Sequence, residues 1–461
     1  MDISRCELSA VSSQRSAKGT RPQGVKRNVL QGRAERSIQE SLLSGWAPPG
    51  KGKDLRTLTE GSIKGKTVVV GVAGGIAAYK AAELVRLLVK AGLTTRVAMT
   101  EHATRFVAPL TFASLSGNRV VWDMWAEDTA PMDHISWGQE ADLIVVAPAT
   151  ANFLAKTAHG LGGDFLSTMI LAATAPVLLC PSMNTRMYLN PAVQANLGLL
   201  KERGYVLMEP GEGELACGTE GPGRLPEPED ILEQALIMLS PQDLRDLRVL
   251  VTAGATAEAL DPVRYLTNRS SGKMGYALAR AARHRGAEVF LVSGPTSLKP
   301  PLGVTFRKVN TTEEMREAVF EYRDRADVII KAAAVLDYRP CHRAEHKMKK
   351  EGDIPPIELE RTPDILAELG SAKGDRRCVL VGFAAETRDL LANARAKLEK
   401  KNLDLIVAND VSRTDAGFET DTNLVKVLYR DGSMEELPLM TKQEVADHLL
   451  DRVRDLWEKW T

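Results

Sequence analysis

The sequence predicts an α/β protein made of two doubly wound, Rossmann-like modules. Apolar runs rich in β-branched residues alternate with helical patterns, which is typical of parallel strands covered by helices on both faces. The alternation begins twice, at residues 67–72 and at 247–256, and each time a glycine-containing loop leads into a helix. The chain has 461 residues, which is more than one hydrophobic core normally supports.

The first module is predicted over residues 63–246 and opens with the strand TVVVGV at 67–72. A helix is expected from Ile76, because apolar residues repeat on one helical face before Gly92 ends it: Leu84, Leu87, Leu88 and Ala91. Further apolar runs predict strands at 94–100, 142–150 and 177–183. These runs indicate a parallel sheet that is buried on both faces.

The second module is predicted over residues 247–461, after a stretch rich in Gly, Pro and Glu. Its expected strands are 247–256, 287–294, 326–335, 378–387 and 403–410. Residues 423–439 alternate in polarity around Asp431-Gly432, which predicts a β-hairpin extension of the sheet. An amphipathic helix is expected to close the chain.

Residues 1–62 are rich in Ser, Arg, Lys and Gly, and their lack of periodicity predicts a disordered extension. Lys+Arg and Asp+Glu number 60 each, so the net charge indicates no nucleic-acid partner. No apolar run reaches the length of a membrane span. The five cysteines are far apart, which favours a reduced, cytoplasmic protein without a cysteine-based zinc site.

The stretch GVAGGIAAYK at 71–80 joins the first strand to its helix and is suited to hold a phosphate. Gly74 and Gly75 let the backbone approach an anion, although a simple tight turn explains the loop equally well. The spacing does not fit G-x-G-x-x-G, and the second strand ends in Thr100-Glu101, where an acid for a ribose hydroxyl is possible but not well defined. A mononucleotide phosphate is therefore favoured over NAD. The turn 148–151 ends another strand at the same edge.

Three further segments carry chemically useful side chains: His134 before a polar turn, Asn184 in PSMNTRMY and Cys217 in a glycine-rich loop. Each residue taken alone is explained by an ordinary structural role. In order along the chain, however, GGIAAYK, VAMTEHA, the histidine, APATANFLAK, PSMNTRMY and ACG resemble the phosphopantothenoylcysteine decarboxylase family of flavoproteins. The resemblance covers residues 64–240.

That resemblance implies a flavodoxin-like sheet, FMN as cofactor and a cofactor site at the strand ends: Gly74, Gly75, Ile76, Thr100, Pro148, Ala149, Thr150 and Ala151. It implies that His134 is a base or orienting group, that Asn184 binds the substrate and that Cys217 donates a proton. Flavin chemistry is needed because loss of the carboxylate would otherwise leave a carbanion with no electron sink. Gly163 replaces an asparagine that family members often carry, which would loosen a polar contact near the flavin or a subunit contact.

The second module begins with TAGATAEALDPVRYLTNRSSGKMGY at 252–276. A Walker loop is excluded, because Thr267 and Met274 stand where glycine and Ser or Thr are required around Gly272-Lys273. The glycines, serines and lysine at a helix start leave an anion site and a capped helix as alternatives.

DPVRYLTNRSSGKMG, AAAVLDYRP, K-x-KK, GFAAET and KNLDLIVAND together resemble the phosphopantothenate–cysteine ligase module, over residues 245–450. The resemblance implies that CTP activates a carboxylate as an acyl-cytidylate, which the amine of cysteine then attacks. It implies that Asn268 holds the acyl-cytidylate and that Mg²⁺ enters mainly through the CTP phosphates. The implied CTP-binding residues are Asp337, Lys347, Pro363, Asp364, Ile365, Leu366, Phe383, Lys397 and Lys401.

Both modules in one chain resemble the bifunctional family of coenzyme A biosynthesis. The implied substrates are 4′-phosphopantothenate, L-cysteine and CTP, and the implied assembly is a homo-oligomer with flavin at subunit contacts. Two other classes are weighed against this prediction. An NAD-type oxidoreductase conflicts with the glycine spacing, and a non-catalytic flavin-binding regulator conflicts with the presence of His134, Asn184, Cys217 and a complete ligase module.

Overall fold

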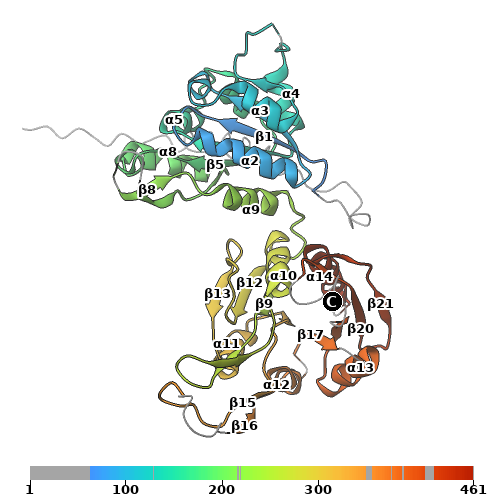
Figure 1. Cartoon of the computed structure of the whole chain (residues 1–461). Helices are drawn as coiled ribbons and strands as arrows, with labels where there is room; N and C mark the ends of the chain where they lie inside the picture. Colours follow the sequence, from blue (N-terminus) through green and yellow to red (C-terminus); the bar gives the residue numbers. More distant parts are fainter. Residues whose placement is uncertain are drawn as a thin grey trace, which may run out of the picture. The chain divides into compact units, whose positions relative to one another are not determined.

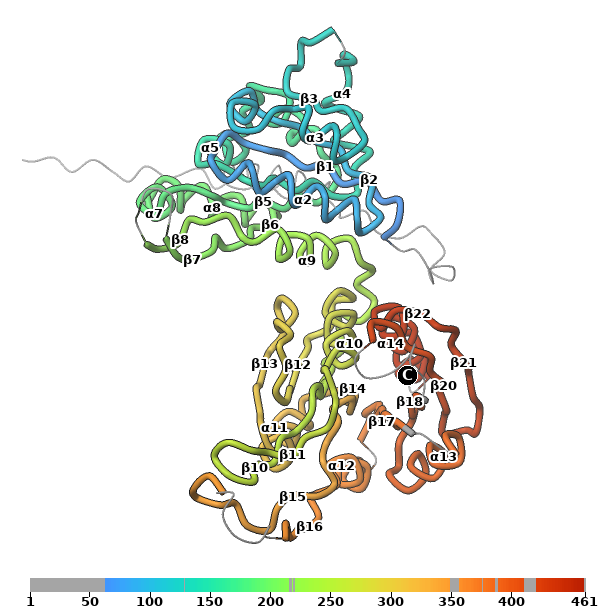
Figure 2. The backbone as a smooth tube through the Cα atoms, in the orientation of Figure 1, coloured from blue at the N-terminus to red at the C-terminus, as the bar shows by residue number. Residues whose placement is uncertain are grey.

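The computed structural model describes residues 63–127, 129–214, 218, 220–348, 356–374, 376–386, 389–410 and 420–459 (Figures 1 and 2). The predicted extension at 1–62 lies outside the described residues. Both modules have the α/β architecture that the sequence predicts: the first is built on a parallel sheet and the second on a mixed sheet whose first six strands in spatial order are parallel.

The first sheet consists of β1 (Thr67–Val72), β2 (Thr94–Met99), β3 (Val120–Val121), β4 (Leu143–Ala149), β5 (Val177–Pro181) and β6 (Val206–Leu207). Its strands are parallel and follow the order β3-β2-β1-β4-β5-β6. Without the two-residue β3 this is the flavodoxin order, and with β3 it is the Rossmann order. Either way the strand order reverses between β1 and β4, which is where ligands bind in such sheets.

Helices cover both faces of this sheet, as Figure 1 shows for α2 in front of β1. They are α2 (Ala78–Lys90), α3 (Pro109–Ser116), α4 (Asp133–Glu140), α5 (Ala151–His159), α6 (Phe165–Ala172), α7 (Thr185–Tyr188), α8 (Pro191–Glu202) and α9 (Pro228–Leu239), with a 3-10 turn at Glu101–Arg105. One apolar cluster joins α2, α3 and α9 to the sheet, and a second joins α5, α6 and α8 to the other face. A separate two-stranded ladder is formed by β7 (Gly211–Glu214) and β8 (Glu220–Arg224).

The predicted start of the first helix was wrong by two residues. α2 begins at Ala78, and the side chain of Ile76 is 63% exposed in the loop before it. The buried face also includes Val85, whereas Leu87 is half-buried. An apolar side chain therefore stands exposed beside the glycines that were assigned to the cofactor.

The second sheet contains β9 (Arg248–Ala253), β12 (Glu288–Ser293), β13 (Thr305–Lys308), β14 (Val328–Lys331), β17 (Val379–Glu386), β18 (Leu405–Asp410), β20 (Val425–Tyr429) and β21 (Met434–Glu436). The order is β13-β12-β9-β14-β17-β18-β20-β21. The strands from β13 to β18 are parallel, and the antiparallel β20 and β21 form the predicted hairpin extension. The order reverses between β9 and β14.

The helices of this module are α10 (Lys273–His284), α11 (Thr312–Arg323), α12 (Ile365–Ala372), α13 (Leu390–Lys400) and α14 (Lys442–Glu458). Three short ladders were not predicted: β10 (Ala257–Ala259) with β11 (Tyr265–Thr267), β15 (Tyr338–Pro340) with β16 (Leu359–Arg361), and β19 (Thr422–Asn423) with β22 (Met440–Thr441).

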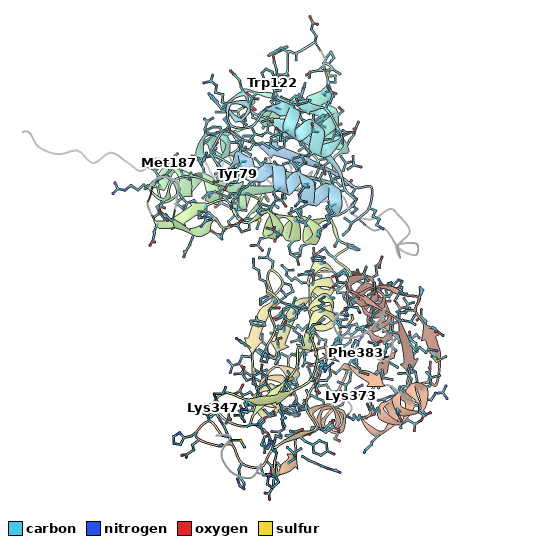
Figure 3. All side chains as sticks on the ribbon, in the orientation of Figure 1. Tyr79, Trp122, Met187, Lys347, Lys373 and Phe383 are labelled. Carbon is cyan, nitrogen blue, oxygen red and sulfur yellow. The ribbon has the colours of Figure 1, made fainter. Side chains whose placement is uncertain are left out.

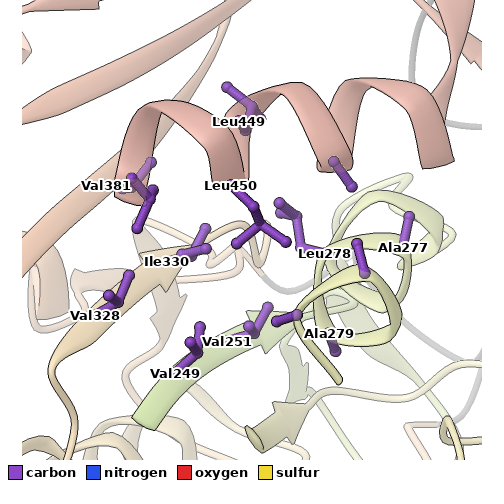
Figure 4. Close-up of a cluster of buried hydrophobic side chains, with 14 of the residues drawn as sticks. Val249, Val251, Ala277, Leu278, Ala279, Val328, Ile330, Val381, Leu449 and Leu450 are labelled. Atoms are coloured by element: carbon purple, nitrogen blue, oxygen red, sulfur yellow. The ribbon is translucent and has the colours of Figure 1, made fainter. Parts of the chain in front are cut away.

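Alternate residues of the second sheet face two different apolar clusters. Val328 and Ile330 of β14 belong to the same apolar cluster as Leu278 of α10 and Leu450 of α14, and Figure 4 shows Ile330 near Leu450. Ile329, between them in the chain, belongs to the cluster formed with α11, α12 and α13. Because side chains alternate along a strand, the next residue after Ile330 also faces the α12 side.

Gly275 sets how closely α10 approaches β9. A Cβ atom at this position would stand 2.5 Å from the Cβ of Ala253 and 2.9 Å from the carbonyl oxygen of Thr252. These are contacts with backbone and a short side chain, which have little room to move. The glycine is therefore required for α10 to begin where β9 ends.

We expect Gly275→Ala to destabilise the second module by about 1–3 kcal/mol, because it overpacks the contact between α10 and β9. Gly198→Ala in α8 is the matched control, since a Cβ there meets nothing within 4 Å. That exchange should stabilise the first module by about 0.5–1 kcal/mol through helix propensity. Urea unfolding measures both effects, and a stabilising Gly275→Ala would contradict the packing argument.

Candidate functional site

The residues assigned to the cofactor lie in loops that meet at the carboxyl ends of β1, β2 and β4. The amide of Ala73 donates to the carbonyl of Pro148 at 3.2 Å, and the amide of Thr100 donates to the carbonyl of Val72 at 3.0 Å. A Cβ at Gly74 would stand 2.5 Å from the Cβ of His102, so a side chain at 74 would displace this loop. The three predicted segments therefore form one edge of the sheet.

Thr100 has a hydroxyl oxygen that is buried and has no hydrogen-bond partner among the described residues. Thr150, which follows β4, instead caps α5, because its side chain accepts a hydrogen bond from the amide of Phe153 at 3.4 Å. Buried polar atoms are normally paired, so the Thr100 hydroxyl at the end of a strand is available for a hydrogen bond to a ligand. Two exposed apolar side chains, Ile76 and Tyr79, stand on the segment that follows the glycines, and Figure 3 labels Tyr79.

Asn184 lies directly after β5 and caps the short helix α7. Its Oδ1 accepts a hydrogen bond from the amide of Arg186 at 2.8 Å. The preceding residue, Met183, donates its amide to the carbonyl of Gly223 in β8 at 3.0 Å. A Cβ at Gly223 would stand 2.2 Å from the carbonyl oxygen of Met183, and its φ of +144° is one that side chains rarely adopt. The hydrogen bond and the close backbone contact between Met183 and Gly223 thus hold the β7/β8 ladder next to Asn184.

Cys217 belongs to the connection between β7 and β8 and lies outside the described residues. Another cysteine of the same module, Cys180 in β5, is fully buried, and burial strongly raises the pKa of its thiol. Cys180 is therefore unsuited to exchange protons with a substrate.

His134 is the second residue of α4 and is half-buried. It makes no hydrogen bond or ion pair with another residue that the structure describes, whereas Asp133 beside it pairs with Arg119. The structure does not join His134 by a hydrogen bond to the loops after β1, β2 or β4. Gly163 lies in the loop before α6, and a Cβ there would stand 3.3 Å from the Nζ of Lys156.

In the second module, the loops after β9 and β14 are bound to each other at the point where the strand order reverses. The amide of Ala334 donates to the carbonyl of Gly254 at 2.9 Å, and the amide of Thr256 donates to the carbonyl of Ala334 at 3.3 Å. The same carbonyl accepts a hydrogen bond from Nδ2 of Asn268 at 3.2 Å. Asn268 therefore lies at the carboxyl ends of the strands where the strand order reverses, which is where ligands bind in parallel sheets of this kind.

The segment that begins α12 adjoins these loops. The amide of Thr362 donates to the carbonyl of Asp337 at 3.0 Å. Asp364 caps α12 by accepting from the amide of Ala367 at 3.1 Å, and its carboxylate pairs with Nζ of Lys401 at 2.9 Å. Burial alone would raise the pKa of Asp364, but hydrogen bonds and positive charge lower it. The structure thus brings together Asp337, Pro363, Asp364 and Lys401.

The other residues assigned to CTP are placed differently. Ile365 and Leu366 are buried in the core, so they can meet a ligand through backbone groups only. Phe383 on β17 and Lys397 on α13 are half-buried. Figure 3 shows Lys347 apart from Phe383, on an exposed segment.

Hydrogen bonds hold the segment in place on both sides of Lys347. Upstream, the amide of Ala344 donates to the carbonyl of Leu260 at 2.9 Å. Downstream, the amide of Met348 donates to Oδ2 of Asp261 at 3.2 Å. Residues 349–355, which include part of the K-x-KK motif, lie outside the described residues.

One residue of this region was not predicted from the sequence. Lys331 ends β14, and its whole residue is 7% exposed. Burial and the charge of Lys401 lower its pKa to about 7, although Asp364 acts in the opposite direction. The only signal in the sequence was a lysine at the end of the apolar run ADVIIK.

Two family models match the chain, and together they cover both modules. The flavoprotein family matches residues 56–240, and the DNA/pantothenate metabolism flavoprotein C-terminal domain family matches residues 244–456. A coenzyme A biosynthesis bifunctional protein CoaBC from Bacillus subtilis (strain 168) is 49% identical over 399 residues, covering 86% of this chain and 98% of the relative.

The chain belongs to the CoaBC family. The CoaBC protein of Escherichia coli (strain K12) is 46% identical and covers 85% of this chain and 97% of its own. A crystal structure of the C-terminal domain of a CoaBC protein is 46% identical, with a TM-score of 0.41, and covers 47% of this chain and 99% of that domain.

As a CoaBC protein, the chain is a bifunctional enzyme of coenzyme A biosynthesis, a decarboxylase and a ligase. The two rival classes, a nicotinamide oxidoreductase and a non-catalytic regulator, are not favoured. Within the described ranges, no three His, Cys, Asp or Glu side chains gather into a group that could bind a metal ion. No described helix is long and apolar enough to cross a membrane.

We expect the folded protein to protect two of its cysteines from alkylation. Cys180 is 0% exposed, and Cys378 is 4% exposed with its pKa raised by burial to about 11. At pH 8 both should react with iodoacetamide at least about 100-fold more slowly than free cysteine, because the thiolate is the reactive form. The half-buried Cys341 should be modified first among these three. Peptide mass spectrometry measures the rates, and rapid labelling of Cys180 in folded protein would contradict its inertness.

Proposed function

We propose that the second module joins L-cysteine to 4′-phosphopantothenate at the expense of CTP, and that the first module holds FMN and decarboxylates the product to 4′-phosphopantetheine. The observation that carries this proposal is the 49% identity with a bifunctional relative along 98% of the relative's length. The product of the ligase is the substrate of the decarboxylase, so the two activities act in sequence.

The residues at the first strand-end site are suited to an FMN phosphate. Gly74 leaves space that a Cβ would fill, and the unpaired hydroxyl of Thr100 can donate to an anionic oxygen. Gly75, Ile76, Pro148, Ala149, Thr150 and Ala151 complete the proposed cofactor site. When bound, FMN supplies the reversible two-electron chemistry that turns the carbon bearing sulfur into an electron sink for loss of CO₂.

Three side chains are proposed to act on the substrate of the first module. Asn184 binds the substrate, and its place beside β8 puts it next to the ladder that carries Cys217. Cys217 donates the proton that completes the product, for which a thiol is better suited than water. His134 is the base or orienting group near the thiol and carboxylate.

In the ligase module, lysines are proposed to neutralise the triphosphate as it approaches the substrate carboxylate. Lys347, Lys397 and Lys401 supply positive charge, together with Mg²⁺ that enters on the CTP phosphates. Asn268 holds the acyl-cytidylate. Its Nδ2 already donates to the carbonyl of Ala334, which leaves one of its two hydrogens for the substrate.

A homo-oligomer is also proposed, because the first module exposes several large apolar side chains. They include Tyr79, Trp122 and Met187, which Figure 3 labels, and Trp125, which is 85% exposed. Apolar surface of this kind marks contact sites. Light scattering on the holoenzyme measures the number of subunits in the assembly.

We also propose that the enzyme is located in the cytoplasm.

The test of the proposed function is a pair of variants that each block one half. With phosphopantothenate, cysteine, CTP and Mg²⁺, the wild type should form phosphopantetheine. Lys347→Gln should lose roughly 100-fold or more in acyl-cytidylate formation, yet decarboxylate supplied 4′-phosphopantothenoylcysteine normally. Cys217→Ser should make that intermediate, keep its flavin and release CO₂ without completing the product. Phosphopantetheine formation by Cys217→Ser at the wild-type rate would contradict the role of the thiol.

We expect Thr100→Val to weaken FMN binding by roughly tenfold or more, since a hydrogen bond to a charged phosphate is lost. The apoprotein should keep its stability or gain about 1 kcal/mol, because an unpaired buried hydroxyl is removed. Thr157→Val is the matched control: this buried hydroxyl donates to the carbonyl of Phe153 at 3.0 Å. It should leave FMN binding unchanged and bring no gain in stability. Flavin fluorescence titration and thermal unfolding separate the two variants.

A further inference from the structure

We propose that Lys331 is an anion-binding residue of the nucleotide site, and that its ammonium group contacts a phosphate oxygen of bound CTP beside the start of α12. The inference rests on the proposed use of CTP and adds a residue to it. Lys331 lies outside the set of lysines assigned above from sequence motifs.

The position of Lys331 is fixed by the sheet. In the register of the parallel strands it stands between Thr252 of β9 and Gly382 of β17. Val328 and Ile330 face α10 and α14 in Figure 4, so Lys331 faces the opposite side, toward α12 and α13. It is the last residue of β14, at the edge of the sheet where the strand order reverses and ligands bind.

Lys331 is buried without a partner. The residue is 7% exposed, and its Nζ forms no hydrogen bond or ion pair with another residue in the described part of the chain. Buried charges in proteins are normally paired or bound to a ligand. Lys373 illustrates the ordinary arrangement, because its side chain, itself 7% exposed, pairs with the carboxylate of Asp404.

Two charged groups act on Lys331 from the elements packed beside it. Asp364 comes from the start of α12, and Lys401 from the end of α13. These two side chains pair with each other at 2.9 Å, so the carboxylate is already engaged. The strand neighbours Thr252 and Gly382 carry no charge. An incoming anion would thus meet two lysines and the free amides of a helix start, with one carboxylate among them.

The protonation of Lys331 should therefore change when CTP binds. Burial and Lys401 lower its pKa to about 7, so above pH 7 the empty site holds mainly the neutral amine. A phosphate oxygen favours the charged form and raises this pKa, so binding takes up a proton. The affinity for CTP should fall as the pH rises above about 7, because binding consumes a proton and the proton concentration in solution is then lower.

The experiment titrates Mg–CTP into the full-length holoenzyme by calorimetry at pH 8, in two buffers of different ionisation enthalpy. The wild type should take up part of a proton for each CTP bound, up to one. Lys331→Met should lose this uptake and bind CTP at least roughly tenfold more weakly. Lys373→Met is the matched control with a buried lysine, and it should lower stability without changing CTP affinity or proton uptake.

Stability gives a second readout that a merely structural lysine would not produce. The pKa of Lys331 is about 7 in the folded chain and about 10.5 for an ordinary lysine in the unfolded chain, so stability rises with pH between these two values. Lys331→Met should remove that rise and unfold at the same or a higher urea concentration at pH 7. Loss of stability in this variant would assign Lys331 a packing role instead.

Several outcomes would overturn the inference. Wild-type affinity and proton uptake in Lys331→Met would exclude contact with CTP. Uptake that follows phosphopantothenate or cysteine but not CTP would assign the residue to another substrate. Normal CTP binding with slow amide formation would make it a base for the amine of cysteine. Failure of the wild type to bind CTP would refute the proposed function itself, which separates that failure from the others.

Discussion

The parallel register of the central strands is the constraint on which both modules depend. In each sheet the first strand lies between the second and a later strand, so the order reverses beside it. The loops that follow the parallel strands then open at one edge, and the helices that follow them begin there. In the second module the two loops at the reversal are further fixed by backbone hydrogen bonds between Gly254, Thr256 and Ala334. Side chains on these loops are therefore placed by strands that are buried on both faces.

Much of this architecture could be predicted from the sequence, because parallel strands produce apolar runs with few exceptions. The runs beginning at Thr67, Thr94 and Val177 start where the strands start, and the Asp431-Gly432 hairpin is present. The predicted start of α2 was wrong at Ile76, because the sequence alone does not distinguish an exposed apolar side chain from a buried one. The short ladders beside both sites were missed, since two or three residues carry no periodicity.

Which of the assigned site residues lie close together could be predicted where a motif spans them, but not where their placement depends on distant parts of the chain. The structure brings four of the assigned residues together: Asp337, Pro363, Asp364 and Lys401. Lys401 lies 37 residues after Asp364 in the sequence, and their side chains form an ion pair. Lys331 was missed because a lysine at the end of an apolar run ordinarily reaches solvent. Its burial depends on α12 and α13, which are distant in sequence. Conversely, Ile365 and Leu366 were grouped with the ligand residues, although their side chains belong to the core.

Thr100 and Lys331 differ from Asn184 and Asn268, the other polar side chains proposed to act at the two sites, in how they are held before a ligand binds. The amides of Asn184 and Asn268 hold their loops through hydrogen bonds to the backbone, so their positions are set before any ligand arrives. Among the described residues neither Thr100 nor Lys331 has such a partner, and each is therefore less stable in the ligand-free protein than a paired group would be. A phosphate oxygen relieves this cost at the moment of binding. If the proposed contacts form, anion binding in both modules would draw part of its free energy from polar groups that folding leaves unsatisfied, one at the strand-end edge of each sheet.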